Sequence, residues 1–398
     1  MSKVASKRLG DLITLKRGYD LPEKVRVVGP YPVISSAGIS GYHNEFKVEG
    51  PGVVTGRYGT LGEMYYVEGK YWPHNTALYV QDFKGNDPKY IYYLLSCLGR
   101  IRTSDKSAVP GVNRNELHEM EIPAISDPSV QSNVRKVLET IDKKIDLNNR
   151  INAELEAMAK TLYDYWFVQF DFPDANGKPY KTSGGKMVYN ETLKREIPAG
   201  WNDSILGEFI ELERGVTYSK EDVRTHDHED TIGVLRATNV TGNTVDIDDL
   251  VLIPSGKVNS SQMLRKFDIL IVMSSGSKEH VGKNGVYYFE KPHAFGAFCS
   301  RIKPVSKCRY FINTFLQSKW FKSYIKNQCL GTNINNLTNA HISMCEIVCP
   351  VSDIVEQFEN KMMPIYSKLA LNTQENNQLV KLRDWLLPLL MNGQVTVK

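Results

Sequence analysis

The chain repeats its own sequence, and this duplication constrains its fold more than any other feature. The segment Leu9–Gly18 recurs 197 residues later as Leu206–Gly215, with the same Leu-Gly near its start and the same Arg-Gly at its end. A Gly-x-Asn-x-Asn pattern at 111–115 recurs 220 residues later at 331–335. Two copies of one pattern predict two copies of one structural unit. Because the offset grows along the chain, we expect the second copy to carry a few extra loop residues.

Each half divides into a globular part and a helical part. The globular parts are rich in Gly, Tyr, Val and Asn, and runs such as Gly52–Thr55 and Asp268–Val272 predict short strands, with helices such as Lys89–Ile101. The fold class that we expect is therefore mixed α/β (α+β). The predicted division is a first globular domain at 1–126, a helical spacer at 127–170, a linker at 171–199, a second globular domain at 200–352 and a second helical spacer at 353–391.

Both helical parts carry the pattern of a coiled coil. In each, two rows of apolar residues repeat every seven positions and are offset by four, which is the seam pattern of paired helices. Asparagine interrupts the seam at matching heights, at Asn148 and Asn152 in the first copy and at Asn372 and Asn376 in the second. Buried Asn fixes register because it pairs well only with another polar group. The pattern favours two long antiparallel helices related by a pseudo-twofold repeat; the alternative is a solvated stretch between two apolar patches.

Composition excludes several classes of protein. The chain is 41% hydrophobic and 24% charged, as globular proteins are, and apolar runs such as Leu386–Met391 fall far short of the roughly 20 residues of a membrane span. The N-terminus shows no apolar signal segment. Six cysteines form no disulfide pattern and predict reduced thiols. We therefore expect a cytoplasmic protein, and the net charge of +4 alone indicates no partner.

Motifs of catalysis are missing from the sequence. The Gly-rich loop at 52–62 lacks the Lys and Ser/Thr of a phosphate-binding loop, because Glu63 and Met64 follow it. The acidic and histidine residues at 226–230 lie too close together on one loop to converge on a metal ion, and the cysteines lack the spacing of a zinc site. No nucleophile elbow and no Asn/Asp-Pro-Pro-Tyr methyltransferase signature occurs. We expect a non-catalytic chain without a metal site.

Positive charge is concentrated in the second half. No Asp or Glu occurs from Lys291 to Cys345, where eight Lys and Arg residues lie. Lys319, Lys322 and Lys326 are three and four positions apart and share one helix face. Cations bind phosphate and Asn can pair with adenine edges, so these residues favour a DNA-binding surface over a merely solvated helix face.

The predicted DNA-binding residues come from the cationic helix faces, the Gly-x-Asn-x-Asn turns and the small-residue loops of both halves. They are Arg57, Tyr58, Arg102, Lys106, Asn113, Arg114, Arg236, Asn239, Lys278, Lys319, Lys322, Lys326, Asn333 and Asn335.

The chain resembles the specificity (S) subunit of type I restriction–modification enzymes. The resemblance rests on the two Leu-Gly-Asp/Glu starts, the loop Arg57–Gly62, the Asn-rich turn before Glu121-Ile122-Pro123, the helix end Leu162–Phe167, and the linker Phe172–Val188 leading to Ile197–Trp201. Each piece is weak alone, but their order and duplication are specific to this family.

The resemblance implies two target recognition domains, each recognising half of an asymmetric bipartite DNA site. It implies that the helices separate these domains and bind methylation (M) subunits, which use S-adenosylmethionine to methylate adenine. A restriction/translocase (R) subunit with ATP and Mg²⁺ is expected in the same complex, and no cofactor in this chain. Two alternatives remain open at this point: a coiled-coil protein-interaction scaffold without DNA specificity, and a stand-alone DNA methyltransferase or nuclease.

Overall fold

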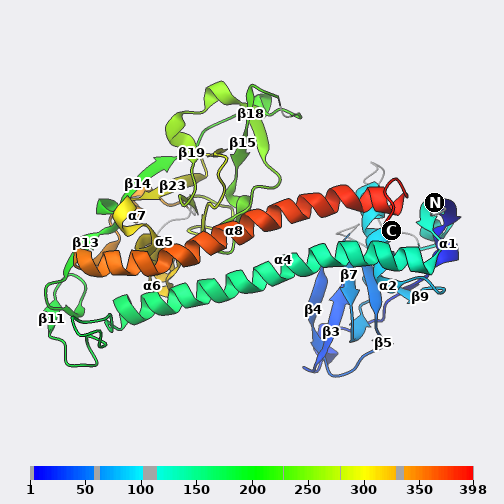
Figure 1. The fold of residues 1–398 in the computed structure, drawn as a ribbon, viewed down its shortest axis with the longest axis horizontal. Coiled ribbons are helices and arrows are strands. Elements are labelled where there is room, and N and C mark those ends of the chain that lie inside the picture. The colour runs from blue at the N-terminus through cyan, green and yellow to red at the C-terminus, as the bar shows by residue number, and fades with distance from the viewer. Residues whose placement is uncertain are drawn as a thin grey trace. The chain divides into compact units, whose positions relative to one another are not determined.

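The computed structural model of the chain contains two compact units. The described residues are 4–57, 63–101, 114–226, 228–277, 279–328 and 336–397. One unit comprises residues up to 146 together with 377–398, and the other comprises 147–376. Both combine sheets with helices (Figure 1), which confirms the expected mixed α/β class. The unit boundaries fall inside the two longest helices, α4 (Pro128–Tyr163) and α8 (Ser352–Met391).

The first unit contains two four-stranded sheets and a separate strand pair. One is antiparallel, in the order β2 (Thr14–Arg17), β9 (Ala77–Asp82), β6 (Gly52–Gly56) and β7 (Met64–Val67). The other has the order β4 (Gly38–His43), β3 (Tyr31–Ser35), β8 (Lys70–Pro73) and β5 (Val48–Glu49), with β3 and β8 parallel. Strand β1 (Val4–Arg8) pairs with β10 (Glu121–Ile125), and the short helices are α1 (Leu9–Leu12), α2 (Pro88–Ile101) and α3 (Arg114–Glu119).

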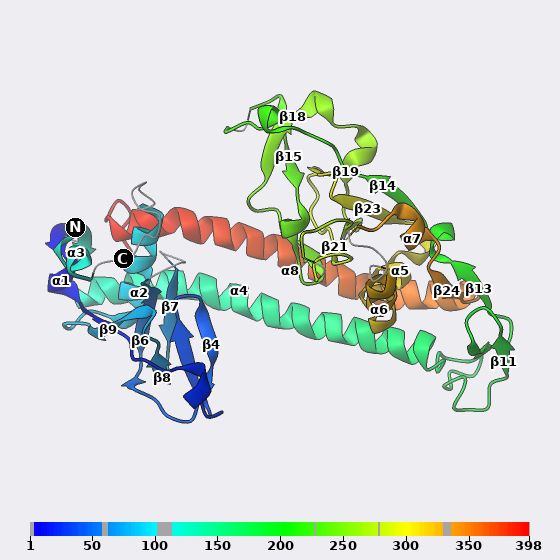
Figure 2. The same ribbon diagram turned by 180° about the vertical axis from the view of Figure 1, so that it is seen from behind.

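The second unit repeats both sheets in the same order and sense. Figure 2 labels several of its strands, among them β14, β15, β18 and β23. The first becomes β14 (Ile210–Arg214), β23 (Cys299–Pro304), β20 (Ile269–Val272) and β21 (Asn284–Val286), extended by β17 (Thr244–Val245) and β16 (Val240–Thr241). The second becomes β18 (Val251–Pro254), β15 (Thr231–Leu235), β22 (His293–Phe295) and β19 (Met263–Leu264), with β15 and β22 parallel. The hairpin β16–β17 accounts for part of the growing offset between the copies.

The remaining elements of the second unit flank these sheets. They are the hairpin β11 (Met187–Asn190) with β12 (Arg195–Pro198), the pair β13 (Asn202–Ile205) with β24 (Glu346–Cys349), and the helices α5 (Arg309–Gln317), α6 (Lys319–Gln328) and α7 (Asn339–Ser343).

The repeated Arg-Gly dipeptide has a steric cause. A Cβ atom built on Gly18 would lie 2.2 Å from the carbonyl oxygen of His74, and one on Gly215 would lie 2.2 Å from that of Gly296. Only glycine permits the end of β2, or of β14, to pass this close to the facing turn. The sequence repeats these glycines because the same close approach occurs in both units.

The two long helices pair antiparallel within each unit (Figure 1). In the second unit Asn148 Nδ2 donates to Glu375 Oε2 (2.8 Å) and Asn376 Oδ1 (2.9 Å), and Asn372 Nδ2 donates to Asn152 Oδ1 (2.9 Å). Asn148 and Asn372 are 0% and 1% exposed. The asparagines therefore lie in the seam and pair across it, which contradicts the solvated alternative. In the first unit Arg383 Nη1 donates to Asp142 Oδ1 at 3.1 Å, in the same antiparallel sense.

Replacing Asn148 by alanine should destabilise the second unit. Asn148→Ala removes the donor to two acceptors in a buried seam, and an unmet buried hydrogen bond costs about 1–3 kcal/mol. We expect the free energy of unfolding, measured by denaturant titration followed by circular dichroism, to fall by that amount. Arg150→Ala, at an exposed position of the same helix, is the matched control and should change stability little. Equal stability of the two variants would contradict a structural role for the buried amide.

Candidate nucleic-acid interface

The two sheets of each unit meet at a junction whose backbone hydrogen bonds are duplicated. In the first unit these bonds are Tyr19 N to Pro73 O (2.8 Å), His74 N to Ile34 O (2.8 Å), Ala77 N to His74 O (2.9 Å) and Arg57 N to Thr76 O (2.9 Å). In the second they are Val216 N to Phe295 O (2.8 Å), Gly296 N to Leu235 O (2.9 Å), Cys299 N to Gly296 O (2.9 Å) and Met273 N to Phe298 O (2.8 Å). The backbone at Arg57, directly after β6, is therefore the structural equivalent of the backbone at Met273, directly after β20.

The junction of the first unit is polar. Arg17 lies 3.4 Å from the carboxylate of Asp20, and Asn75 donates a hydrogen bond to the same carboxylate. His74 Nδ1 lies 3.0 Å from Thr76 Oγ1, and burial, followed by the charge of Arg26, lowers the pKa of this histidine. Carboxylate, amide and guanidinium groups at one place can present both donors and acceptors to base edges.

The equivalent junction of the second unit encloses a cavity of about 500 Å³. Its walls come from four segments of the chain, and the lining residues are Val216, Thr217, Tyr218, Arg236, Ala237, Thr238, Ser274, Ser275, Gly276, Gly296, Ala297, Phe298 and Cys299. Arg236 binds the carboxylate of Asp249 at 2.6 Å. Asn239 is 4% exposed, and its amide bonds Arg236 N and Asp248 O, so this residue holds the loop together rather than facing a ligand.

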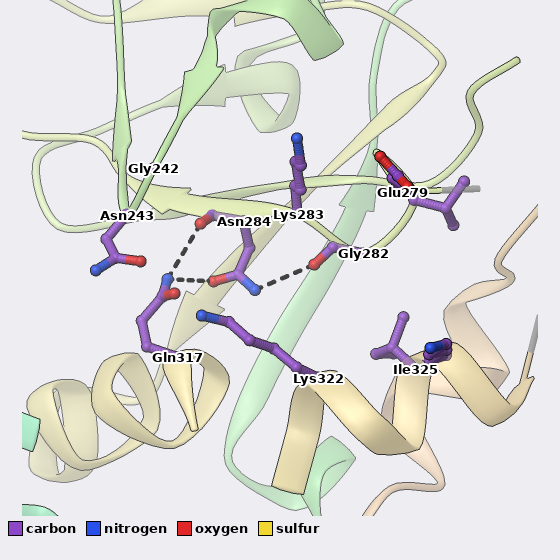
Figure 3. A pocket seen from close by; sticks show the side chains of 11 residues that line it. Gly242, Asn243, Glu279, Gly282, Lys283, Asn284, Gln317, Lys322 and Ile325 are labelled. Carbon is purple, nitrogen blue, oxygen red and sulfur yellow. Dashed lines mark hydrogen bonds between the residues drawn. The ribbon is translucent and has the colours of Figure 1, made fainter. Parts of the chain in front are cut away.

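A second cavity, of about 610 Å³, lies where α6 meets the loop before β21. Lys322 and Lys326 of α6 line it together with Lys283, and the amides of Asn243 and Gln317 complete its polar wall. Figure 3 shows the Lys322 side chain extending toward Gln317 and Asn284. The lining also includes the acidic Glu279, and Figure 3 shows the Lys283 side chain extending away from Lys322. Lysine side chains such as Lys322 are suited to contact phosphate. We call this cavity the cationic cavity.

A half-buried carboxylate, that of Glu156, lies next to the cationic cavity. Asn243, at the tip of the β16–β17 hairpin, donates to Glu156 Oε2 of α4 at 2.8 Å. Burial raises the pKa of the Glu156 carboxyl, while this hydrogen bond and the charge of Lys322 act in the opposite direction. The inserted hairpin thus connects the second globular half to α4. Sequence reasoning missed Glu156, Asn243 and Lys283, and only the insertion indicated that this half differs here.

The structure brings some of the predicted residues together and separates others. Lys322 and Lys326 share the cationic cavity, whereas Lys319 is exposed at the first turn of α6 and does not line it. Arg57 is half-buried at the first junction, and Arg114 is exposed at the start of α3. The predicted residues outside the described ones are Tyr58, Arg102, Lys106, Asn113, Lys278, Asn333 and Asn335.

The described residues give little support for a metal site or for a reactive thiol. Among the residues that the structure describes, no group of three or more His, Cys, Asp or Glu side chains could hold a metal ion. Burial raises the pKa of Cys299, Cys308 and Cys345 to about 12, which keeps these thiols protonated and unreactive. No helix in the described ranges is both long and apolar enough to span a bilayer.

Comparisons with known proteins agree on one family. Residues 1–157 and 198–381 match the type I restriction modification DNA specificity domain. The chain is 32% identical over 209 residues to the EcoKI specificity subunit of Escherichia coli K12, a match that covers 51% of this chain and 45% of that subunit. It is 26% identical over 330 residues to the MjaIX specificity subunit of Methanocaldococcus jannaschii, covering 80% and 73%. The chain therefore matches less than half the length of the first relative.

A solved structure shows the same fold. The type I restriction–modification S subunit from M. genitalium aligns with a TM-score of 0.59 over 98% of this chain and 96% of its own, at 17% sequence identity. This likeness supports the architecture of two sheet-rich halves with long helices.

Substitution of the lysines that line the cationic cavity tests whether they contact DNA phosphates. The double variant Lys322→Ala, Lys326→Ala should weaken binding to DNA of every sequence, because phosphate contacts carry no sequence information. The slope of log affinity against log salt should flatten by about one unit per lost contact. Lys178→Ala with Lys181→Ala, two exposed lysines of the linker, is the matched control. Fluorescence anisotropy at several salt concentrations measures both quantities, and an unchanged slope would make the two lysines a solvated helix face.

Proposed function

Because this chain belongs to the family of type I restriction modification DNA specificity domains, we propose that it supplies the DNA sequence specificity of a type I restriction–modification enzyme. The observation that carries the proposal is the duplicated junction. One backbone framework occurs twice and presents different side chains each time. A molecule that recognises two different half-sites requires this combination of constant framework and variable surface.

Each globular half recognises one part of an asymmetric, bipartite site in double-stranded DNA. In the second half the cationic cavity contacts phosphates, which positions the domain, and the junction next to it contacts base edges. The distribution of charge supports assigning phosphate contacts to one cavity and base contacts to the other. Lys283, Lys322 and Lys326 line the cationic cavity, whereas Arg236 of the junction cavity is paired with Asp249.

The chain acts without catalysis of its own, as a subunit of a restriction endonuclease and adenine methyltransferase complex in a prokaryotic cytoplasm. Methylation subunits supply S-adenosylmethionine chemistry, and restriction/translocase subunits supply the chemistry that requires ATP and Mg²⁺. This chain contributes binding and assembly.

The long helices carry the assembly function. Large apolar side chains remain exposed on them: Leu147, Met158, Met363 and Leu371 in the second unit are 46–61% exposed, and Leu382 and Trp385 in the first are 43% and 62% exposed. Leu382 and Trp385 are three positions apart and therefore lie on one face of α8. Exposed apolar helix faces support docking of partner helices. We assign these faces to the methylation subunits.

Domain exchange tests the bipartite proposal. Replacing residues 1–126 with the corresponding part of another specificity subunit should change one half-site, and replacing 200–352 should change only the other. Mapping methylated adenines in a host genome that carries the assembled system measures both. Each exchange is the control for the other. A single exchange that alters both half-sites, in a complex that still methylates DNA, would contradict independent recognition.

The assembly proposal predicts a binding defect for Trp385→Ala. An exposed tryptophan that becomes buried in an interface commonly contributes 2 kcal/mol or more, so affinity for the methylation subunit should fall about 30-fold. Isothermal titration calorimetry with the purified subunit measures this. Val188→Ala removes a side chain that is 49% exposed on β11 instead of a long helix, and should bind normally. Equal affinities would place the docking face elsewhere.

A further inference from the structure

Phe298 is an exposed aromatic residue at a position where the first half uses its side chain for structure. It lies in the turn between β22 and β23 and is 69% exposed. The equivalent residue by backbone hydrogen bonding is Thr76. Its Oγ1 accepts a hydrogen bond from Ser36 N (3.3 Å) and lies 3.0 Å from His74 Nδ1. Thr76 therefore stabilises its own turn, whereas the Phe298 side chain extends into solvent.

The backbone holds Phe298 firmly in place. Its carbonyl oxygen accepts hydrogen bonds from Met273 N (2.8 Å) and Ser274 N (3.2 Å), at the start of the loop after β20. The turn thus depends on main-chain atoms and does not require the aromatic ring. A large apolar side chain that is fixed at its base and exposed at its tip loses little conformational entropy on contacting a ligand.

The cavity beside Phe298 is lined mostly by uncharged side chains, several of which carry methyl groups, and the guanidinium of Arg214 donates to the carbonyl oxygen of Ala297 at 3.2 Å. The cavity at its side is lined by Val216, Ala297 and Thr238, among others. Arg236 is the charged residue among the described lining residues, and the carboxylate of Asp249 pairs with it. Recognition of guanine commonly uses a bidentate Arg or Lys, whereas thymine is distinguished by its 5-methyl group through apolar contact. The chemistry of this cavity fits the methyl group.

One loop connects this junction to the cationic cavity. Ser274, Ser275 and Gly276 line the junction cavity, and a few residues later Glu279 and the run 281–283 line the cationic cavity. A duplex whose phosphates are held by the lysines would therefore present its bases to adjacent parts of the same loop. This continuity argues for DNA, rather than a protein partner, as the molecule that contacts Phe298.

We propose that Phe298 is a specificity-determining residue that contacts the 5-methyl group of a thymine in the half-site recognised by the second half. The proposal rests on the proposed function and adds to it the base chemistry of one half-site. At the equivalent position the first half has Thr76, whose Oγ1 is hydrogen-bonded within its own turn and which carries no aromatic ring. Methyl recognition through this turn therefore belongs to the second half-site.

The test combines a base analogue with a side-chain variant. The complex of the full chain with its methylation subunits is titrated with duplexes that carry uracil in place of each thymine of the second half-site, one at a time. Wild-type protein should lose about fourfold in affinity at one thymine, the factor expected for one methyl-sized apolar contact. Phe298→Ala should lose at least that factor on the unmodified duplex and should no longer distinguish thymine from uracil there.

Three controls separate this contact from other effects. Phe298→Leu keeps an apolar side chain and should retain part of the discrimination. Val305→Ala, at a residue 41% exposed just beyond β23, should behave as wild type. Binding of unrelated duplexes and the salt slope should be the same for wild type and Phe298→Ala, because the phosphate contacts are unchanged.

The alternative results are distinct. Three results would each overturn the assignment of Phe298. The first is that no thymine-to-uracil change in the second half-site affects affinity, and the second is that the affinity losses from uracil and from Phe298→Ala add. The third is an equal loss of affinity on unrelated DNA, which indicates sequence-independent stacking. Failure of the wild-type complex to prefer any DNA site over unrelated duplexes would instead overturn the proposed function.

Discussion

The pairing of α4 with α8 is the constraint on which the rest of the structure depends, because both units take part of their core from these helices. In the first unit Leu138 of α4 and Leu390 of α8 belong to the same buried cluster as Ile122 of the sheet pair β1–β10. In the second unit Tyr163 of α4 and Phe358 of α8 belong to the cluster that also includes strand β20. The register of the helix pair therefore determines which helical side chains each half can pack against. The buried asparagines fix that register, since a shift by one turn would keep one asparagine pair but leave the other amide opposite an apolar residue of the seam.

Each globular half is also tied to the helices by buried or half-buried carboxylates. In the first unit Tyr93 of α2 donates to Asp142 of α4 at 2.5 Å, and in the second Asn243 donates to Glu156 of α4. Glu359 of α8 accepts hydrogen bonds from the first amides of α5 at 2.8 and 3.1 Å. Such carboxylates lose solvation and need these donors, so they are effective only in one arrangement. They therefore orient each half on its helices, in addition to the non-directional apolar packing.

The two halves carry different side chains on one repeated backbone. Matching glycines, strand orders and junction hydrogen bonds preserve the framework, and these are main-chain properties. Side chains at the same junction differ in kind: Asn75 and Thr76 stand in one half where Ala297 and Phe298 stand in the other. In the second half backbone atoms hold this turn, so its side chains can change without loss of the fold, whereas in the first half Thr76 Oγ1 adds a hydrogen bond to the turn. Stability at this turn therefore depends mainly on the main chain, while the exposed side chains differ between the halves.

The sequence alone determined the duplication, the mixed α/β class and the asparagine-interrupted helix seam, because repeats and seven-residue periods are local properties of the chain. It also identified Lys322 and Lys326 as neighbours on a helix. Only the tertiary structure decided that Lys283 joins them, that Asn239 is buried in its own loop, and that Phe298 is exposed. Those outcomes depend on which distant strands and turns come together, and a residue's type does not reveal whether its polar atoms are already paired. Exposure and pairing are long-range properties, and they distinguish a residue that binds a ligand from one that stabilises the fold.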